Sequence, residues 1–233
     1  GELGPRPIDL HLEALRKLGA EIREEHGCLL CTAPGGLRGG FVSFAFPSVG
    51  ATENLLLAAA RAKGTTVLTN AAREPEIEDL AGYLNRCGAH IHGAGESCIV
   101  IEGVPHLYGS TYTVMPDRIA AATYMAAAAV TGGTVLLRDV NSEHLLPVLS
   151  AFESTGCAVM QSGSELLLRA PQRLKPVRHV RTMPYPGFPT DAQAPVMTMA
   201  AVGDGTRYFC REHFLKAAIS MPVSSTGSAR RSS

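Results

Sequence analysis

The sequence of 233 residues lacks tryptophan, carries no net charge and contains no long apolar run. Its 21 acidic residues balance 21 basic residues, so the overall charge does not favour nucleic acid or an acidic membrane surface as a partner. The longest apolar run, residues 119–130, is shorter than the roughly 18 residues that a membrane span requires. These absences argue against a membrane or nucleic-acid partner. The 45% of hydrophobic residues predicts a globular protein with one large core or two moderate ones.

Cysteine is sparse and scattered, with six residues in a chain too long to need disulfides. Cys28 and Cys31 have the spacing of a metal-binding pair, but the two leucines between them predict a strand. Positions three apart on a strand face opposite sides, and no second pair accompanies them, so we expect no zinc site. The cysteines fit a reducing compartment and the first residues do not resemble a signal peptide, so a cytoplasmic protein is expected.

An internal repeat is the most informative property of the sequence. The segment Gly-Thr-Thr-Val-Leu at residues 64–68 reappears 68 positions later as Gly-Gly-Thr-Val-Leu at residues 132–136, and the same shift carries Gly88 onto Gly156. Each unit reads as an alanine-rich helix, a strand, a second helix that ends at glycine, and a pair of strands. With a strand before each alanine-rich helix, the predicted order is β-α-β-α-β-β.

The repeat fixes where the elements are expected. The alanine-rich helices are predicted at 51–62 and 119–130, and the closing strand pairs at 89–92 with 98–102 and at 158–161 with 165–169. A partial copy precedes them, with a helix at 9–18 and strands at 20–23 and 27–32, and a further copy begins at Asp191. Because the alanine-rich helices are apolar on nearly all sides, we expect them to be buried on nearly all sides, with sheets around them.

Three helix starts are expected on one face if the units pack in parallel: residues 48–52, 116–118 and 189–191. Free N–H groups and the positive end of the helix dipole make such a start an anion site. Ser48 and Gly50 suit phosphate oxygens, although serine is also the commonest N-cap. Arg118 is either a surface salt-bridge partner or a fixed cation facing the same cleft.

The stretch from Tyr185 to Asp191 is expected to lead into the last of these helices. Prolines at 184, 186 and 189 hold an extended approach, so the helix is predicted to start at Thr190 or Asp191, with Asp191 as its cap.

Two other charged segments precede predicted helices. Residues 6–9, Arg-Pro-Ile-Asp, place Asp9 as a plausible cap. Residues 73–76, Arg-Glu-Pro-Glu, are either a solvated loop or a functional one.

Four motifs in register carry a family resemblance. They are Phe-Pro-Ser-Val-Gly-Ala-Thr-Glu-Asn at 46–54, Asn-Ala-Ala-Arg-Glu-Pro-Glu-Ile at 70–77, Pro-Asp-Arg-Ile at 116–119 and Tyr-Pro-Gly-Phe-Pro-Thr-Asp-Ala-Gln at 185–193. They resemble the enolpyruvyl transferase family, and within it the enzymes of peptidoglycan synthesis that act on UDP-N-acetylglucosamine. The resemblance covers about residues 2–209. It implies an α/β (α+β) fold, an inside-out α/β prism in two pseudo-symmetric domains, with residues 1–115 in the first domain and 116–209 in the second.

The resemblance also implies a reaction and its residues. The enolpyruvyl group of phosphoenolpyruvate would be transferred to the 3-hydroxyl of UDP-N-acetylglucosamine by addition and elimination, with release of phosphate and without a metal or organic cofactor. Asp191 resembles the carboxylate that takes the proton from the sugar hydroxyl, which requires hydrogen-bond reach of that hydroxyl. The implied substrate contacts are Arg6, Pro7, Ile8, Asp9 and Leu10 for uridine, Ser48, Val49 and Gly50 at the nucleotide-binding helix start, and Glu74, Arg118 and Thr190 in the cleft.

The chain departs from the family pattern in three places. Gly1 stands where the family has a cysteine that donates a proton to phosphoenolpyruvate, and glycine cannot donate one. Ala120 stands where the family usually has glutamate. After Thr206 the sequence does not continue into the family's Phe-Glu-Asn-Arg segment, so we expect a frameshifted or partial sequence whose residues 210–233 are disordered.

Three hypotheses follow. The first is a carboxyvinyltransferase that acts on UDP-N-acetylglucosamine. The second is an inactive fragment or pseudoenzyme with residual nucleotide binding, which Gly1 and the tail favour. The third is a shikimate-3-phosphate enolpyruvyl transferase, which Asp9 and the 73–76 loop disfavour. An incomplete set of units would leave an apolar flank open, which predicts self-association.

Overall fold

The computed structural model describes residues 7–177, 180–203 and 209–211. Its helices are α1 (Asp9–Lys17), α2 (Val49–Ala59), α3 (Pro75–Arg86), α4 (Arg118–Val130), α5 (Leu146–Ser154) and α6 (Gln193–Val202), with 3₁₀ turns η1 (Ser142–Leu145) and η2 (Thr190–Ala192). Its strands are β1 (Glu21–Glu25), β2 (Cys28–Thr32), β3 (Phe41–Ser43), β4 (Thr65–Thr69), β5 (His90–His92), β6 (Cys98–Glu102), β7 (Thr134–Leu137), β8 (Ala158–Ser162), β9 (Glu165–Arg169), β10 (Val180–Thr182) and β11 (Phe209–Arg211). None of the described helices is long and apolar enough to cross a membrane.

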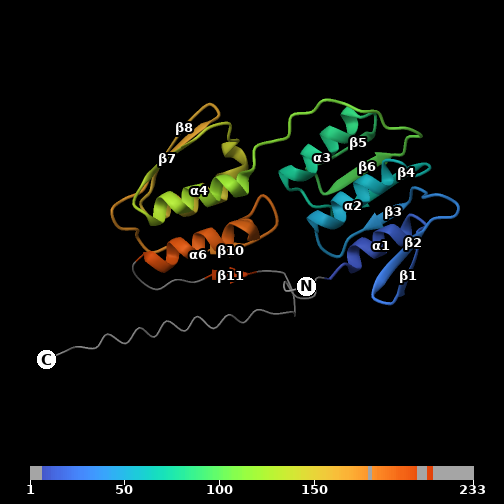
Figure 1. Cartoon of the computed structure of the whole chain (residues 1–233), viewed down its shortest axis with the longest axis horizontal. Coiled ribbons are helices and arrows are strands. Elements are labelled where there is room, and N and C mark those ends of the chain that lie inside the picture. Colours follow the sequence, from blue (N-terminus) through green and yellow to red (C-terminus); the bar gives the residue numbers. More distant parts are fainter. Residues whose placement is uncertain (1–6, 178–179, 204–208, 212–233) are drawn as a thin grey trace.

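The described structure consists of two halves, α1 to β6 and α4 to β11, which follow the predicted repeat (Figure 1). In the first half β6 lies between β4 and β5 and is antiparallel to both, and in the second half β9 lies in the same way between β7 and β8. The predicted closing strand pairs are therefore confirmed. The predicted glycine ends are confirmed as well, because Gly88 and Gly156 follow α3 and α5 with φ of 98° and 92°. Glycine adopts this left-handed conformation without strain, and it ends both helices.

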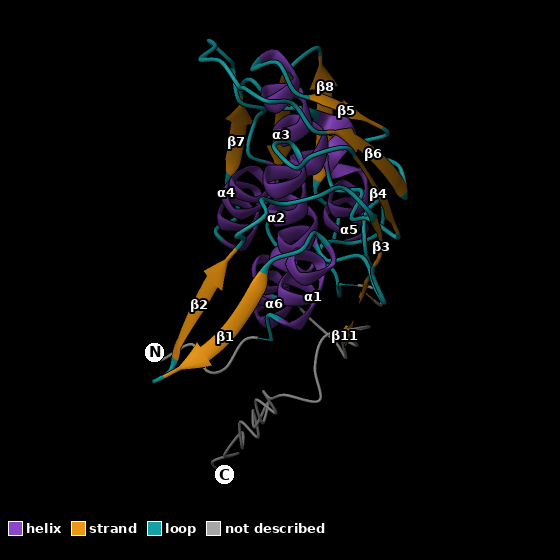
Figure 2. Ribbon diagram, turned by 90° about the vertical axis from the view of Figure 1, so that its right-hand side faces the viewer, coloured by secondary structure: helices purple, strands orange, loops and turns teal. Residues whose placement is uncertain are grey.

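The predicted partial copy is also present. Helix α1 is followed by the antiparallel hairpin of β1 and β2, which projects from the rest of the first half (Figure 2). Every residue of β2 is exposed, Cys28 and Cys31 included.

The strands that precede and follow α2 in the sequence are parallel to each other, and so are those that precede and follow α6. Strand β3 is parallel to β4 with α2 between them in sequence, and β10 is parallel to β11 with α6 between them. The prediction of a strand before each alanine-rich helix is wrong for α4, because residues 103–117 form no strand in the described structure. This linker instead bonds to the first half, where Val104 N–H donates to the Ala60 carbonyl and Tyr108 N–H to the Cys87 carbonyl.

Strand β11 also bears on the predicted disordered tail. It ends at Arg211 and so includes the first two residues of the segment 210–233. Residues 212–233 lie outside the described residues.

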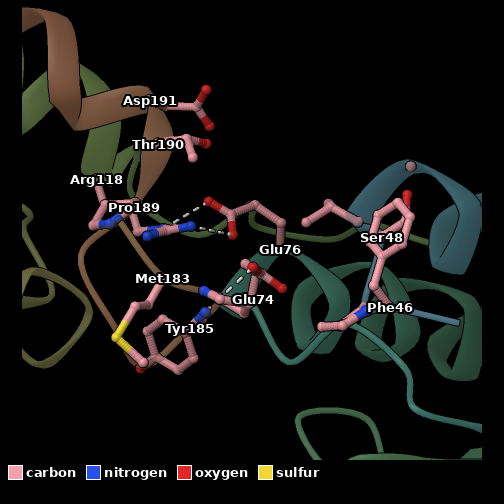
Figure 3. A pocket seen from close by; sticks show the side chains of 14 residues that line it. Phe46, Ser48, Glu74, Glu76, Arg118, Met183, Tyr185, Pro189, Thr190 and Asp191 are labelled. Carbon is pink, nitrogen blue, oxygen red and sulfur yellow. Dashed lines mark hydrogen bonds and ion pairs between the residues drawn. The ribbon is translucent and has the colours of Figure 1, made fainter. Parts of the chain in front are cut away.

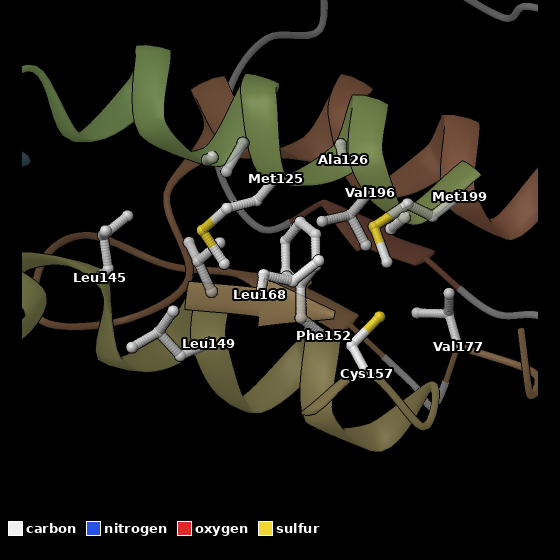
Figure 4. Packing of buried hydrophobic residues seen from close by; sticks show 14 of the residues in the cluster. Met125, Ala126, Leu145, Leu149, Phe152, Cys157, Leu168, Val177, Val196 and Met199 are labelled. Atoms are coloured by element: carbon white, nitrogen blue, oxygen red, sulfur yellow. The ribbon is translucent and has the colours of Figure 1, made fainter. Parts of the chain in front are cut away.

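Each half has its own core. In the first half the buried cluster joins α1, α2 and α3 to the sheet of β3 to β6, with Leu55 of α2 and Ile99 of β6 fully buried. In the second half Phe152 of α5 lies at the centre, packed among residues of α4, α6 and β9 such as Met125, Val196 and Leu168 (Figure 4). The predicted mixed α/β class is therefore confirmed.

The two alanine-rich helices, α2 and α4, are less buried than predicted. Leu57 of α2 is 51% exposed and Tyr124 of α4 is 64% exposed, so one edge of each helix faces solvent. The expectation of burial on nearly all sides is wrong for the described structure. Helix α2 packs against α1, α3 and β6, and α4 packs against α6, β7, β9 and both 3₁₀ turns, while Leu57 and Tyr124 stay exposed.

Candidate active site

A cavity of about 480 Å³ lies between the two halves, where several helices begin (Figure 3). Its lining consists of Phe46, Pro47, Ser48, Val49, Gly50, Glu74, Glu76, Arg118, Met183, Pro184, Tyr185, Pro189, Thr190 and Asp191. The starts of α2, α4 and η2 thus share one cavity, as the sequence predicts. In the view of Figure 3, Ser48 lies on one side of it, Thr190, Asp191 and Arg118 lie on the other, and Glu76 lies between them.

The cavity-lining loops follow the carboxyl ends of strands. Phe46 follows β3, Glu74 follows β4, and residues 183–189 follow β10. Two hydrogen bonds hold the first two loops in place: Asn70 Nδ2 donates to the Phe44 carbonyl (2.9 Å), and the buried Thr52 hydroxyl accepts from Ala72 N–H (3.1 Å). Loops at the carboxyl ends of parallel strands are the usual place for ligands in α/β folds.

The start of α2 is capped by Ser48, whose Oγ accepts from Ala51 N–H at 3.4 Å. The serine that is expected to meet phosphate oxygens is therefore also an N-cap. A Cβ added to Gly50 would lie 3.1 Å from Cε1 of His11, so this glycine lets α1 approach α2. His11 is fixed there by its contact with Asn54, Nδ1 to Nδ2 at 2.6 Å.

Arg118 is buried, with 5% of its surface exposed, and pairs with Glu76 across the two halves. Its Nε donates to Glu76 Oε1 at 2.9 Å and its Nη2 donates to Glu76 Oε2 at 3.1 Å, the two parallel bonds that suit a guanidinium and a carboxylate. The guanidinium also lies over the Tyr185 ring, 5.7 Å from its centroid, within the range of a cation–π contact. Of the two alternatives for Arg118, the structure shows a paired cation that lines the cavity.

Carboxylates gather around this pair. Glu74 Oε1 accepts from Tyr185 N–H at 3.4 Å, so it touches the loop that leads to Asp191. Burial raises the pKa of Glu53 in α2, and the negative charges of Glu76 and Glu74 raise it further. The 73–76 loop is therefore a set of contacts between the halves rather than a solvated loop.

Asp191 is exposed and does not cap a helix, contrary to the prediction. The N-cap of η2 is Pro189, and the regular helix α6 begins only at Gln193. Pro195 explains the difference, because it has no N–H to donate to the carbonyl of Asp191 four residues earlier. The Asp191 carboxylate has no hydrogen-bond partner in the part of the chain that the structure describes, and it remains available to a ligand.

The predicted uridine segment does not line this cavity. Pro7, Ile8 and Asp9 are exposed and Leu10 is half-buried, at the start of α1. The N-cap of α1 is Ile8, so the prediction that Asp9 caps this helix is wrong. Arg6 lies outside the described residues, as does Gly1.

Three residues at or beside the cavity have no role in the sequence analysis. Glu76 and Tyr185 complete the contact with Arg118, and His11 covers the first turn of α2. Glu76 and Tyr185 stand inside quoted motifs, but nothing in the sequence pairs either with an arginine far along the chain. No signal in the sequence indicates His11.

The arrangement combines a free carboxylate with the N-terminal end of a helix. In the described lining the only guanidinium is that of Arg118, which Glu76 already neutralises. The cavity can therefore accept a proton from a bound hydroxyl and offer N–H groups to an anion, but a dianion needs further cations. No group of three or more potential metal ligands occurs among the described residues.

Comparison with known proteins places this geometry in context. A family model described as EPSP synthase (3-phosphoshikimate 1-carboxyvinyltransferase) matches residues 1–213. A UDP-N-acetylglucosamine 1-carboxyvinyltransferase 1 from Symbiobacterium thermophilum is 50% identical over 204 residues, which are 88% of this chain and 46% of that protein. A UDP-N-acetylglucosamine 1-carboxyvinyltransferase from Gluconobacter oxydans is 50% identical over 203 residues, 87% of this chain and 48% of that protein. The chain spans about half the length of the curated relatives it matches.

Solved structures agree on the fold. The enolpyruvyl transferase NikO from Streptomyces tendae matches with a TM-score of 0.75 and 23% identity, over 88% of this chain and 52% of that one. The EPSP synthase from Acinetobacter baumannii matches with a TM-score of 0.58 and 23% identity, over 90% of this chain and 50% of that one. At this identity the likeness concerns the fold alone.

Proposed function

Because the chain belongs to the EPSP synthase family of carboxyvinyltransferases, we propose that it serves enolpyruvyl transfer from phosphoenolpyruvate to the 3-hydroxyl of UDP-N-acetylglucosamine, the first committed step of peptidoglycan synthesis. The choice of sugar nucleotide over shikimate 3-phosphate rests on the relatives named for UDP-N-acetylglucosamine, which are about 50% identical to this chain.

One observation carries the proposal: the carboxylate of Asp191, which has no hydrogen-bond partner among the described residues, and the first turn of α2 line the same cavity. In the proposed role Asp191 accepts the proton of the sugar 3-hydroxyl as the oxygen attacks, and Thr190 contacts the same sugar. Ser48, Val49 and Gly50 offer hydroxyl and N–H groups to the diphosphate at the positive end of α2. Pro7 to Leu10, with Arg6 before them, hold the uridine.

Arg118 and Glu74 have a supporting part in this proposal. Arg118 contacts the Tyr185 ring, and Glu74 accepts from the Tyr185 N–H, so both hold the loop that ends at Asp191. Since the one described guanidinium in the cavity is already paired, the negative charges of phosphoenolpyruvate would need cations beyond the described lining. Binding of the sugar nucleotide is therefore the first property to test.

We test the proposal by titrating the purified chain with UDP-N-acetylglucosamine in a calorimeter, with shikimate 3-phosphate as the control ligand. We expect saturable binding of the sugar nucleotide alone, and weaker binding by Ser48→Ala. Binding of shikimate 3-phosphate alone would reverse the choice of substrate, and no binding of either at millimolar concentration would refute a retained site.

Turnover separates the catalytic hypothesis from the inactive one. With phosphoenolpyruvate present, release of phosphate that depends on UDP-N-acetylglucosamine supports catalysis, and binding without release supports a fragment or pseudoenzyme. If turnover is found, Asp191→Asn should lower it by about 10²-fold or more, the range expected for a general base, while binding changes little.

The wider setting is also proposed. The relatives are about twice as long as this chain, so we infer that the whole fold consists of two inside-out prisms of such units. The free thiols of Cys28, Cys31, Cys87, Cys98 and Cys157 support a cytoplasmic location. The exposed edges of α2 and α4 favour self-association of this chain, and a monomer at all concentrations in sedimentation would contradict that.

A further inference from the structure

A second cavity, of about 880 Å³, lies beside the proposed active site, between α3, the linker 103–117 and the start of α4. The linker runs past α3 on its way to α4 (Figure 1). The lining consists of Glu76, Asp79, Leu80, Tyr83, Ser110, Tyr112, Val114, Met115, Asp117, Ile119 and Asp191. The volume is in the range of small-molecule sites, and of its lining residues only Asp191 has a role in the proposed function.

The walls are apolar and aromatic. Tyr83 and Tyr112 meet edge to face, with ring centroids 5.6 Å apart and planes at 68°. Tyr83 is 41% exposed and Val114 is 72% exposed, and both line the cavity. This surface offers a ligand both apolar contact and the negative face of a tyrosine ring.

The ionised groups of the described lining all carry negative charge. Glu76 is neutralised by Arg118, which leaves the carboxylates of Asp79, Asp117 and Asp191. Asp79 accepts from Tyr112 O–H and Met115 N–H through Oδ1 alone, and Asp117 caps α4 through Oδ1 alone. The second oxygen of each, and both oxygens of Asp191, have no partner among the described residues and can accept from a ligand.

We propose that this cavity binds an organic ammonium ion with an aromatic or apolar body. The carboxylates attract the ammonium group, the tyrosine rings stabilise it through cation–π contact, and Leu80, Val114 and Ile119 bury the body. The carboxylates of Asp79 and Asp117, which do not line the proposed active site, disfavour an anion in this second cavity. The binding requires no catalytic activity, and its failure leaves the proposed function untouched.

Three probes of one shape and different charge test this site: 3-phenylpropylammonium, 3-phenylpropan-1-ol and 3-phenylpropanoate. The chain is labelled with ¹³C at its seven methionine methyl groups and titrated near pH 7. We expect the ammonium ion to shift the Met115 signal saturably, with an affinity about fivefold or more above that of the alcohol, and the carboxylate to cause no shift. Equal affinity for the ammonium ion and the alcohol, or an unmoved Met115 signal, would overturn the proposal.

Two pairs of variants locate the contacts. Asp79→Asn keeps the oxygen that accepts from Tyr112 and Met115 but removes the charge, and it should weaken binding about threefold. Its control, Asp139→Asn, removes one carboxylate outside the cavity and should have no effect. Tyr83→Leu should weaken binding about threefold through loss of the ring, and Tyr124→Leu on α4 should not. Controls that weaken binding as much as Asp79→Asn and Tyr83→Leu would show a non-specific surface and would refute the site.

Discussion

The ion pair between Glu76 and Arg118 allows a sharp test of how the two halves are held together. Glu76→Gln keeps the size of the side chain but removes its charge, and one of its two terminal groups changes from acceptor to donor. Arg118 has only 6% of its side chain exposed. In the variant its buried guanidinium would keep one hydrogen bond but lose the other and the opposite charge. Glu76 itself is 35% exposed, so water reaches the pair from that side.

The magnitude follows from this partial burial. Breaking a fully buried pair costs about 3 to 5 kcal/mol, and an exposed pair contributes about 0 to 1 kcal/mol. With one buried and one half-buried partner, we expect Glu76→Gln to lower the free energy of unfolding by about 2 kcal/mol. A matched control exists in the second half: Arg138 Nε donates to Glu165 Oε1 at 3.2 Å, with side chains 73% and 47% exposed. There Glu165→Gln should cost less than about 0.5 kcal/mol.

Urea unfolding followed by circular dichroism measures both variants, at low and at high salt. The cost of Glu165→Gln should vanish at 1 M salt, while most of that of Glu76→Gln should persist because the guanidinium of Arg118 is buried and is screened less than an exposed charge. The double variant Glu76→Gln with Arg118→Met should be less destabilised than the two single costs together predict. If Glu76→Gln costs no more than the control, or if its cost is lost in salt, Arg118 does not depend on this carboxylate.

Other consequences are open to the same measurement. Gly103→Ala should lower the free energy of unfolding by about 3 kcal/mol, because an added Cβ would overlap the Ala62 carbonyl, whereas Gly109→Ala meets nothing and should be neutral. Asp117→Ala should cost about 1 kcal/mol through loss of the α4 cap, and Asp117→Ser should cost less. The raised pKa of Glu53 means that its ionised form opposes folding; the penalty is absent below its ordinary value of 4.5 and complete above the raised value. Glu53→Gln should therefore stabilise the chain near pH 7 and not at about pH 4, and equal gains at both would refute the shift.

Most of the fold can be predicted from the sequence because the repeat consists of residues that determine the structure of their own segment. Glycines that end helices and apolar residues at alternate strand positions need no knowledge of the partner element, so α3, β6 and their counterparts α5 and β9 are foreseen. The path of the linker 103–117 cannot be predicted from the sequence. It is set by hydrogen bonds to backbone carbonyls of the first half, and any residue type provides such a carbonyl.

The candidate site also has one part that the sequence predicts and one part that it does not. The convergence of the starts of α2, α4 and η2 follows from the repeat and is predicted. The partner of Arg118 is not, since Glu76 lies 42 positions away and only the packing of the halves brings the two together. The later start of α6 can be predicted from the sequence, because Pro195 has no N–H to bond the Asp191 carbonyl in a regular α-helix.

The separation of the two cores has a consequence for cooperativity. The two buried clusters share no residue, and the described contacts between the halves include the pair of Glu76 and Arg118, the loop at Tyr185 and the linker. These contacts are mostly polar hydrogen bonds and an ion pair, so we expect damage to one core to affect the other only weakly. We therefore expect this chain to melt in two weakly linked transitions, so that the enthalpy measured in a calorimeter exceeds the enthalpy from a two-state analysis of the same curve.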